Sequence, residues 1–132
     1  MNIKNKQFIK DAFTQVVGST IVDEKIIAHF FHSNYQQNVD GVQLDFSGFI
    51  QHMKAQKGIV SKIIVNFRNI AAEGELVFTN HDVIVTKNDG SMIKIHVLAE
   101  FRIAEGKIIS CDELTRLEQG APEDHNIGSM TE

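Results

Sequence analysis

Hydrophobic residues recur at helical spacing in the first part of the chain, up to Gly58. Three apolar faces with a period of three to four residues predict three helices: over residues 5–17, after Asp23, and from about Asp45 to Gly58. Before the third helix, the stretch "NYQQNVDG" at residues 34–41 predicts a short extended segment that enters a turn. The helical faces consist of Phe8, Ile9, Ala12, Phe13 and Val16; Ile26, Ile27, Phe30 and Phe31; and Phe46, Phe49, Ile50 and Met53.

Residues 59–117 follow a different pattern, which is typical of β-strands. They are rich in Ile, Val, Phe and Thr and contain no Pro. Three turns of the form x-acid-Gly, at residues 72–74, 88–90 and 104–106, divide them into the four strands of an antiparallel meander. Three helices followed by such a sheet predict a single α+β domain over residues 1–117, with the helices on one face of a curled sheet. Residues 118–132 are polar and aperiodic, and we expect a C-terminal tail or a strap along the surface.

The turn sequences also predict which side chains share a face of the sheet. A three-residue hairpin loop with Gly in the left-handed position pairs the two residues that flank it, so odd-numbered residues of all four strands lie on one, mostly apolar, face. On that face His81 opposes Val97, and Val97 opposes Glu113. The imidazole and the carboxylate are therefore expected in one row. This prediction requires three residues in every loop, because a one-residue slip exchanges the two faces.

His81 and Glu113 are consequently the leading candidates for chemistry. An imidazole and a carboxylate on an apolar face are costly unless they are hydrogen-bonded, so either a working site or a structural pair must explain them. As a site, a neutral His81 accepts a proton from the substrate, Glu113 orients the ring or relays charge, and Tyr35 donates a hydrogen bond to a developing oxyanion. As a structural pair, the two groups are satisfied by Tyr35, Thr115 or water.

Further residues are expected to contact a ligand in the same pocket. His52 flanks the apolar face of the third predicted helix, near the mouth of the cavity. Thr79, Ala99, Cys111 and Thr115 belong to the inward face of the sheet. We interpret Cys111 as a small buried hydrophobe rather than a nucleophile, because buried single thiols usually pack in that way.

Composition narrows the class of protein. A chain of 132 residues, 42% of them hydrophobic, is the size of one domain with a real core. The net charge of -4 and the lack of a basic cluster argue against a nucleic-acid surface. No apolar run approaches the roughly 18 residues of a membrane span, and no leader is evident, so we expect a cytoplasmic protein without membrane contact. The chain has one cysteine, and His29 and His32 lie off the apolar face of their predicted helix, so we predict no metal site. It also lacks a phosphate-binding loop, and we predict no cofactor.

The chain resembles the nuclear transport factor 2-like superfamily, in its SnoaL-like branch, over about residues 5–117. The resemblance rests on the first two helices, on "NYQQNVDG" before a third helix, and on "FRIAEGKIISCDELTRL" at residues 101–117, which is similar to a recurring F-R-x-x-x-G-K-I segment. It implies a cone-shaped α+β barrel, in which three N-terminal helices pack on the concave face of a curled antiparallel sheet. It also implies a pocket between helices and sheet, and commonly a homodimer.

The resemblance adds two pocket positions. Ketosteroid isomerase, a member of this superfamily, uses a tyrosine and two aspartates. Along this chain these fall near Phe13, near Gln37 or Asn38, and near Ala99, so none of them is kept. SnoaL-type cyclases often carry a Q-H pair where this chain has Gln37 and Asn38. We therefore expect Phe13 and Gln37 to contact a ligand, and we do not expect either relative's mechanism to be copied.

Two functional hypotheses remain open from the sequence. The first is a homodimeric pocket protein that binds a compact, largely apolar metabolite and pairs through the convex face of its sheet. If this protein is an enzyme, the resemblance implies a cofactor-free isomerase, cyclase, dehydratase or hydrolase. The second is a non-catalytic ligand-binding or dimerisation module whose polar groups satisfy one another. Fold analogy does not choose between them.

Overall fold

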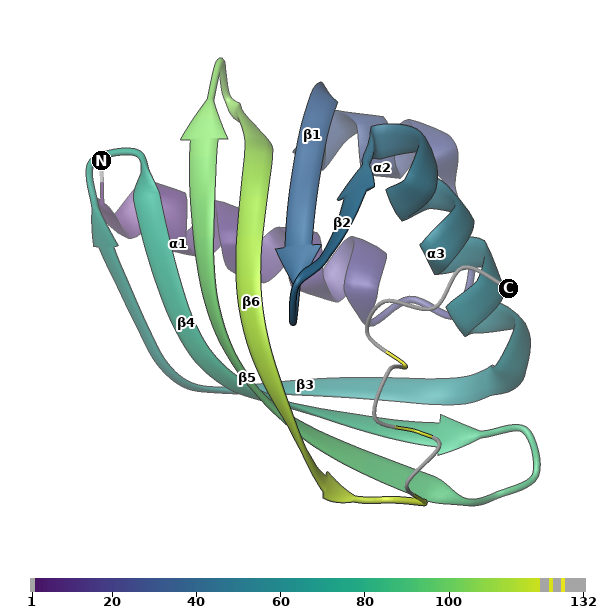
Figure 1. The fold of residues 1–132 in the computed structure, drawn as a ribbon. Coiled ribbons are helices and arrows are strands. Elements are labelled where there is room, and N and C mark those ends of the chain that lie inside the picture. The colour runs from purple at the N-terminus through teal and green to yellow at the C-terminus, as the bar shows by residue number, and fades with distance from the viewer. Residues whose placement is uncertain (1, 122–123, 125–126, 128–132) are drawn as a thin grey trace.

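The computed structural model describes residues 2–121, 124 and 127 of the chain. These residues form three α-helices, one π-helical turn and six β-strands (Figure 1). The helical elements are α1 (Asn2–Ala12), η1 (Phe13–Val17), α2 (Glu24–Phe30) and α3 (Phe46–Ile59). The strands are β1 (Phe31–Val39), β2 (Val42–Asp45), β3 (Val60–Glu73), β4 (Leu76–Lys87), β5 (Met92–Ala104) and β6 (Lys107–Gln119).

Aspartate side chains begin two of the helices. Asp23 accepts hydrogen bonds from two backbone amides in the first turn of α2, and Asp45 accepts one from the amide of Gly48 at 2.8 Å. Helix α3 thus begins one residue after Asp45, as predicted. Phe31, which the pattern assigned to the second helix, is instead the first residue of β1.

The six strands form one curled sheet in the order β2-β1-β6-β5-β4-β3. Strands β3 to β6 make the predicted antiparallel meander. The extended segment expected at residues 34–41 adds to this sheet as part of the hairpin β1–β2, and because β1 pairs in parallel with β6, the whole sheet is mixed rather than antiparallel. Asp40 and Gly41 form the loop of this hairpin with φ values of 52° and 87°, the left-handed pair that Asp-Gly loops favour.

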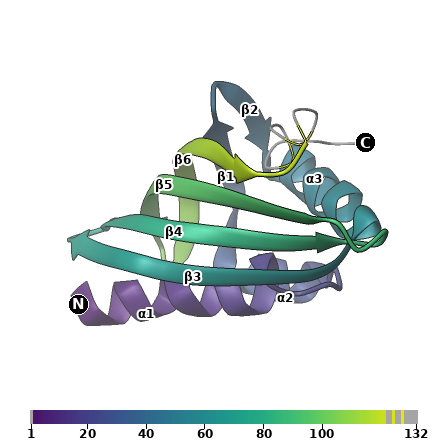
Figure 2. The same ribbon diagram turned by 90° about the horizontal axis from the view of Figure 1, so that it is seen from below.

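The helices lie on the concave side of the sheet (Figure 1). Helix α1 runs along β3, as Figure 2 shows from below, and α3 packs beside β1 and β2. The most deeply buried side chains come from both layers, with Ile9 of α1 and Val77 and Val85 of β4 all 0% exposed. Within the described residues, no helix combines the length and the apolar character needed to cross a membrane.

Two of the three hairpin loops are shorter than predicted. Glu73 pairs with Leu76 and Ala104 pairs with Lys107, so each of these loops contains two residues instead of three. Each hairpin also contains a bulge, which compensates for the missing loop residue and restores the predicted face. The loop at residues 88–90 has the predicted length. The predicted inward face is therefore correct in the middle of the sheet, although two of the three loops have a different length from the one expected.

The bulges change which residues share a row on the concave face. His81 pairs with Val97, as predicted. Val97, however, pairs with Thr115, while Glu113 pairs with Ala99. The prediction of one row for His81 and Glu113 is thus wrong, because the shorter loop and the bulge between β5 and β6 each shift the pairing by one residue and together move Glu113 along by two. His81 and Glu113 still face the same side of the sheet.

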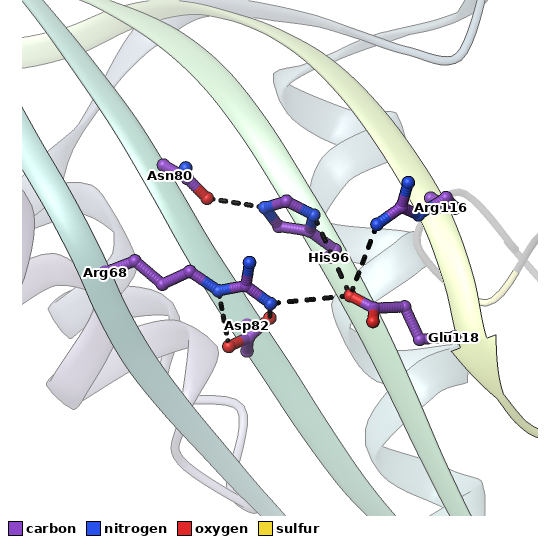
Figure 3. A network of polar contacts seen from close by, with 6 residues as sticks. All are labelled: Arg68, Asn80, Asp82, His96, Arg116 and Glu118. Atoms are coloured by element: carbon purple, nitrogen blue, oxygen red, sulfur yellow. Dashed lines mark hydrogen bonds and ion pairs between the residues drawn. The ribbon is translucent and has the colours of Figure 1, made fainter.

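The convex face carries a polar network that joins strands β3 to β6 (Figure 3). Arg68 donates two hydrogen bonds to Asp82, at 2.9 and 2.7 Å, and these bonds lower the pKa of the Asp82 carboxyl. The rest of the network is centred on Glu118, whose Oε1 lies within 4.0 Å of a nitrogen atom of three basic side chains. The members of this network are Arg68, Asn80, Asp82, His96, Arg116 and Glu118.

Part of the expected C-terminal tail packs against the domain. Strand β6 continues to Gln119, beyond the expected boundary at Leu117. The carboxylate of Asp124 pairs with the Nζ of Lys87 at 2.8 Å, and Ile127 is 2% exposed within the hydrophobic core. The expectation of a tail over residues 122–123, 125–126 and 128–132 lies outside the described residues.

Candidate functional site

A cavity of about 90 Å³ lies between the helices and the concave face of the sheet. Its walls come from η1, α3, β1 and the inward face of β4 to β6, and they are mostly apolar. Seven of the ten predicted site residues line it: Phe13, Tyr35, Gln37, His52, His81, Glu113 and Thr115. The other three, Thr79, Ala99 and Cys111, are buried but do not line the cavity.

His81 lies on β4 in a buried, aromatic environment. It is 1% exposed, and its ring centroid lies 4.8 Å from that of Phe13 and 5.5 Å from that of Phe67. Thr79, two residues along the same strand and therefore on the same face, places its Oγ1 3.0 Å from Nδ1 of His81. Burial lowers the pKa of His81 to about 4. The ring is consequently neutral at neutral pH, with Thr79 fixing its orientation.

Glu113 lies on β6 and has the opposite electrostatic character. Burial raises the pKa of its carboxyl to about 7, with a smaller contribution from the nearby charge of Asp40. The thiol of Cys111 donates a hydrogen bond to Oε1 of Glu113 at 3.3 Å and opposes this rise. Near pH 7 the carboxyl is therefore present in both its protonated and its charged form.

Asp40 connects the β1–β2 hairpin to this part of the site. Its carboxylate accepts hydrogen bonds from both the backbone amide, at 2.8 Å, and the hydroxyl of Thr115. The backbone amide of Asp40 in turn donates to the carbonyl of Glu113 at 3.0 Å. These bonds hold the loop of the hairpin against β6 at Glu113 and Thr115. Asp40 is thus a supporting residue that the sequence reasoning had assigned only to a turn.

Tyr35 and Gln37 form a second polar pair on β1. The phenol of Tyr35 donates a hydrogen bond to Oε1 of Gln37 at 2.9 Å, and burial raises the pKa of Tyr35 well above its ordinary value. The ring packs against those of Phe31 and Phe49, with centroids 4.8 and 4.9 Å away. The hydroxyl proton of Tyr35 is therefore engaged by Gln37, and the phenol remains uncharged at neutral pH.

Helix α3 contributes a polar residue that the sequence reasoning missed. Gln56 is 7% exposed and lines the cavity together with His52 and Met53. It stands four residues after His52, so the two side chains lie on the same face of the helix. That spacing is visible in the sequence, and continuing the apolar face of the third helix by one more turn predicts Gln56 as a lining residue.

His81 and Glu113 line the same cavity from β4 and β6, two strands of its sheet wall. They lie two strands apart, and Glu113 is displaced by two residues along its strand from the row of His81. For ordinary strand geometry this corresponds to about 12 Å between their backbones. A compact molecule between them would contact both groups. In the part of the chain that the structure describes, no three side chains of His, Cys, Asp or Glu converge in a way that could hold a metal ion.

Comparison with known proteins places this geometry in a familiar architecture. No family model matches the chain. The uncharacterized protein C11D3.04c of Schizosaccharomyces pombe is 28% identical over 130 residues, which cover 98% of this chain and 99% of that protein. An LEH-like epoxide hydrolase from M. tuberculosis has a TM-score of 0.72 at 13% identity, covering 87% of this chain and 84% of its own. A candidate SnoaL-like polyketide cyclase from Shewanella denitrificans has a TM-score of 0.72 at 10% identity, covering 86% and 90%.

At these identities the solved structures establish the architecture and leave the chemistry to the residues of this chain. The cone-shaped sheet, the three helices on its concave side and the cavity between them agree with that comparison. The chain has the nuclear transport factor 2-like fold, in the form that SnoaL-like proteins share.

Proposed function

We propose that this protein is a small-molecule enzyme that transfers a proton within the cavity by means of its own acid–base residues. One observation carries the proposal: Glu113, with a pKa raised to about 7, lines the same cavity as the neutral imidazole of His81. A general acid–base group works best when its pKa lies near the operating pH. By this criterion Glu113 moves the proton, while His81, whose pKa is about 4, serves as a neutral hydrogen-bonding partner of the substrate.

This assignment changes the roles expected from the sequence, where His81 was the proton acceptor and Tyr35 the donor to an oxyanion. Tyr35 already donates to Gln37, so using it for a substrate requires that bond to be exchanged. We therefore propose Tyr35 and Gln37 as a positioning pair in the wall of the cavity. The epoxide hydrolase and the candidate cyclase with the same fold support a catalytic reading of such a pocket, but only by analogy.

The size and lining of the cavity limit the substrate. Pockets for drug-sized ligands usually measure about 300–1,000 Å³. A cavity of about 90 Å³ with mostly apolar walls suits a compact, largely apolar molecule with few polar groups. The single thiol of Cys111 is free and buried, which fits the proposal of a reducing, cytoplasmic location.

The proposal is tested with two compact probes. Cyclopentanone in D₂O reports proton abstraction next to a carbonyl, and cyclopentene oxide reports acid-assisted ring opening, both followed by NMR. We expect the protein to accelerate one of these reactions and Glu113→Gln to abolish the acceleration. Glu100→Gln, an exposed carboxyl on β5, is the matched control and keeps the wild-type rate. If neither reaction is faster than with the Glu113→Gln variant, the proton-transfer function is wrong.

A second candidate function is a binding module without catalysis. It is favoured by the way the polar groups of the site already satisfy one another: Thr79 with His81, Tyr35 with Gln37, and Cys111 with Glu113. Tight binding of either probe without turnover, and without any effect of Glu113→Gln on affinity, would support this alternative.

We also propose that the protein forms a homodimer through the convex face of its sheet. The large apolar side chains exposed there include three neighbours, Phe78 at 44%, Leu98 at 50% and Leu114 at 67%. Leu98 and Leu114 are direct cross-strand partners, so they form one continuous surface. An exposed apolar patch of this kind, next to the polar network of Figure 3, is typical of a protein–protein contact.

A further inference from the structure

The amide of Gln56 has a fixed orientation in the wall of the cavity. Its Nε2 donates a hydrogen bond to the carbonyl of Ile127 at 3.5 Å. A carbonyl only accepts, so the NH₂ end of the amide must face Ile127 and the oxygen must face away from it. Ile127 is itself 2% exposed, so its carbonyl is presented from a packed position.

The oxygen of the same amide is left without a partner. Among the side chains that the structure describes, Oε1 of Gln56 is buried and makes no hydrogen bond. Buried polar atoms are normally paired, and an exception in an otherwise satisfied site requires an explanation. Thr79 with His81, Tyr35 with Gln37, and Cys111 with Glu113 all show the usual pairing. Gln56 differs from these groups, and it lies on α3, across the cavity from the sheet.

We infer that Gln56 is a specificity residue whose Oε1 accepts a hydrogen bond from a hydroxyl or N–H group of the bound molecule. The inference deepens the proposed function, on which it rests for the claim that this molecule is the substrate. The ligand class is then a compact apolar skeleton with one hydrogen-bond donor. The donor group faces α3, and the rest of the molecule lies against Phe13, His81 and Glu113 on the other walls.

A matched pair of probes isolates this donor. Pyrrole and furan are five-membered aromatic rings of nearly equal size, but only pyrrole carries an N–H. We expect the wild-type protein to bind pyrrole about fivefold more tightly than furan, the effect of one neutral hydrogen bond, as measured by NMR chemical-shift titration. In Gln56→Met, which keeps the length of the side chain and removes the amide, the preference disappears. Gln51→Met, an exposed position of the same helix, retains it.

A second readout does not depend on the variant being folded. In the wild-type protein, the side-chain carbonyl carbon of Gln56 should shift further downfield when pyrrole binds than when furan binds, because only pyrrole donates a hydrogen bond to Oε1. Equal affinity for the two probes, or a preference that survives Gln56→Met, overturns the inference while leaving proton transfer by Glu113 untouched. Failure of the cyclopentanone and cyclopentene oxide assays with the pyrrole preference intact overturns the enzyme and leaves the donor site standing. If neither pyrrole nor furan binds, the inference is wrong.

Discussion

The thiol of Cys111 lies 3.3 Å from Oε1 of Glu113, two residues along the same strand, and donates a hydrogen bond to it. A thiol donor favours the charged carboxylate and so lowers the pKa of Glu113, whereas burial raises it. Burial is the larger effect, and the result is a pKa of about 7. Removing the thiol of Cys111 and removing the charge of Asp40 should therefore shift the pKa of Glu113 in opposite directions.

Replacing Cys111 by Val removes the donor and keeps an apolar side chain of similar size. The charged form of Glu113 then loses a hydrogen bond, so we expect its pKa to rise above the wild-type value. The side-chain carboxyl carbon of Glu113 in ¹³C NMR reports this pKa directly. A pKa that stays the same or falls in Cys111→Val would show that the thiol does not act on the carboxylate.

Asp40→Asn should move the same pKa the other way. The negative charge of Asp40 raises the pKa of Glu113, and asparagine removes that charge while keeping an oxygen that can accept from the amide of Thr115. We expect a lower pKa for Glu113, measured by the same ¹³C titration. Asp45→Asn, which also replaces an aspartate outside the cavity, is the control that should leave the pKa unchanged.

His81 should give a pH-dependent contribution to stability with a defined sign. Its pKa is about 4 in the folded protein and about 6.5 in an unfolded chain, so the unfolded state binds more protons between these values. His81 therefore increases the free energy of unfolding as the pH rises from about 4 to 6.5, by an amount on the order of 3 kcal/mol. This contribution is lost as the pH falls through the same range.

Glu113 opposes this effect over an overlapping range. Its pKa of about 7 exceeds the unfolded value of about 4.3, so its contribution is present at low pH and is lost as the pH rises through about 7. The free energy of unfolding, measured with urea at several pH values, should therefore change its dependence on pH in opposite directions in two variants. We expect His81→Leu to make the free energy of unfolding fall with rising pH and Glu113→Gln to make it rise. Equal pH profiles for both variants and the wild type would contradict the account of both groups.

The convex apolar patch of Phe78, Leu98 and Leu114 leads to a prediction about assembly. Leu98→Glu places a charge opposite Leu114 at the centre of that patch. We expect the wild-type protein to sediment as a dimer and the variant as a monomer with an unchanged circular dichroism spectrum. Val42→Glu, an exposed apolar position on β2, is the control and should stay dimeric. A wild-type protein that remains monomeric at high concentration would exclude this interface.

Local signals in the sequence were sufficient for most of the elements. Asp45 predicts the start of α3 because a short carboxylate there can cap the helix, and the cap is present. In the meander, mostly apolar side chains at odd-numbered positions alternate with polar side chains at even-numbered positions. His81 has an odd-numbered position, and it is buried and faces inward as that alternation predicts. Likewise, the Asp40-Gly41 pair marks a turn, and a turn is found there.

The remaining features depend on contacts between distant segments. The two-residue loop at residues 105–106 occurs together with a bulge between β5 and β6. The loop and the bulge together shift Glu113 out of the row of His81. The parallel pairing of β1 with β6 joins residues more than 70 positions apart and has no local signal. The pKa values of His81 and Glu113 follow from burial by several elements at once, so an inward-facing position alone did not separate their roles.

The central claim is that a carboxyl group titrates near neutral pH inside this cavity. The most direct measurement is a ¹³C NMR titration of the side-chain carboxyl carbon of Glu113 in the wild-type protein between about pH 3 and pH 9. The account predicts a midpoint of about 7, far above the value of about 4.3 for an unperturbed glutamate. A midpoint near 4.3 would show that the carboxylate is charged and solvated at neutral pH, and the proposed proton transfer by Glu113 would be wrong.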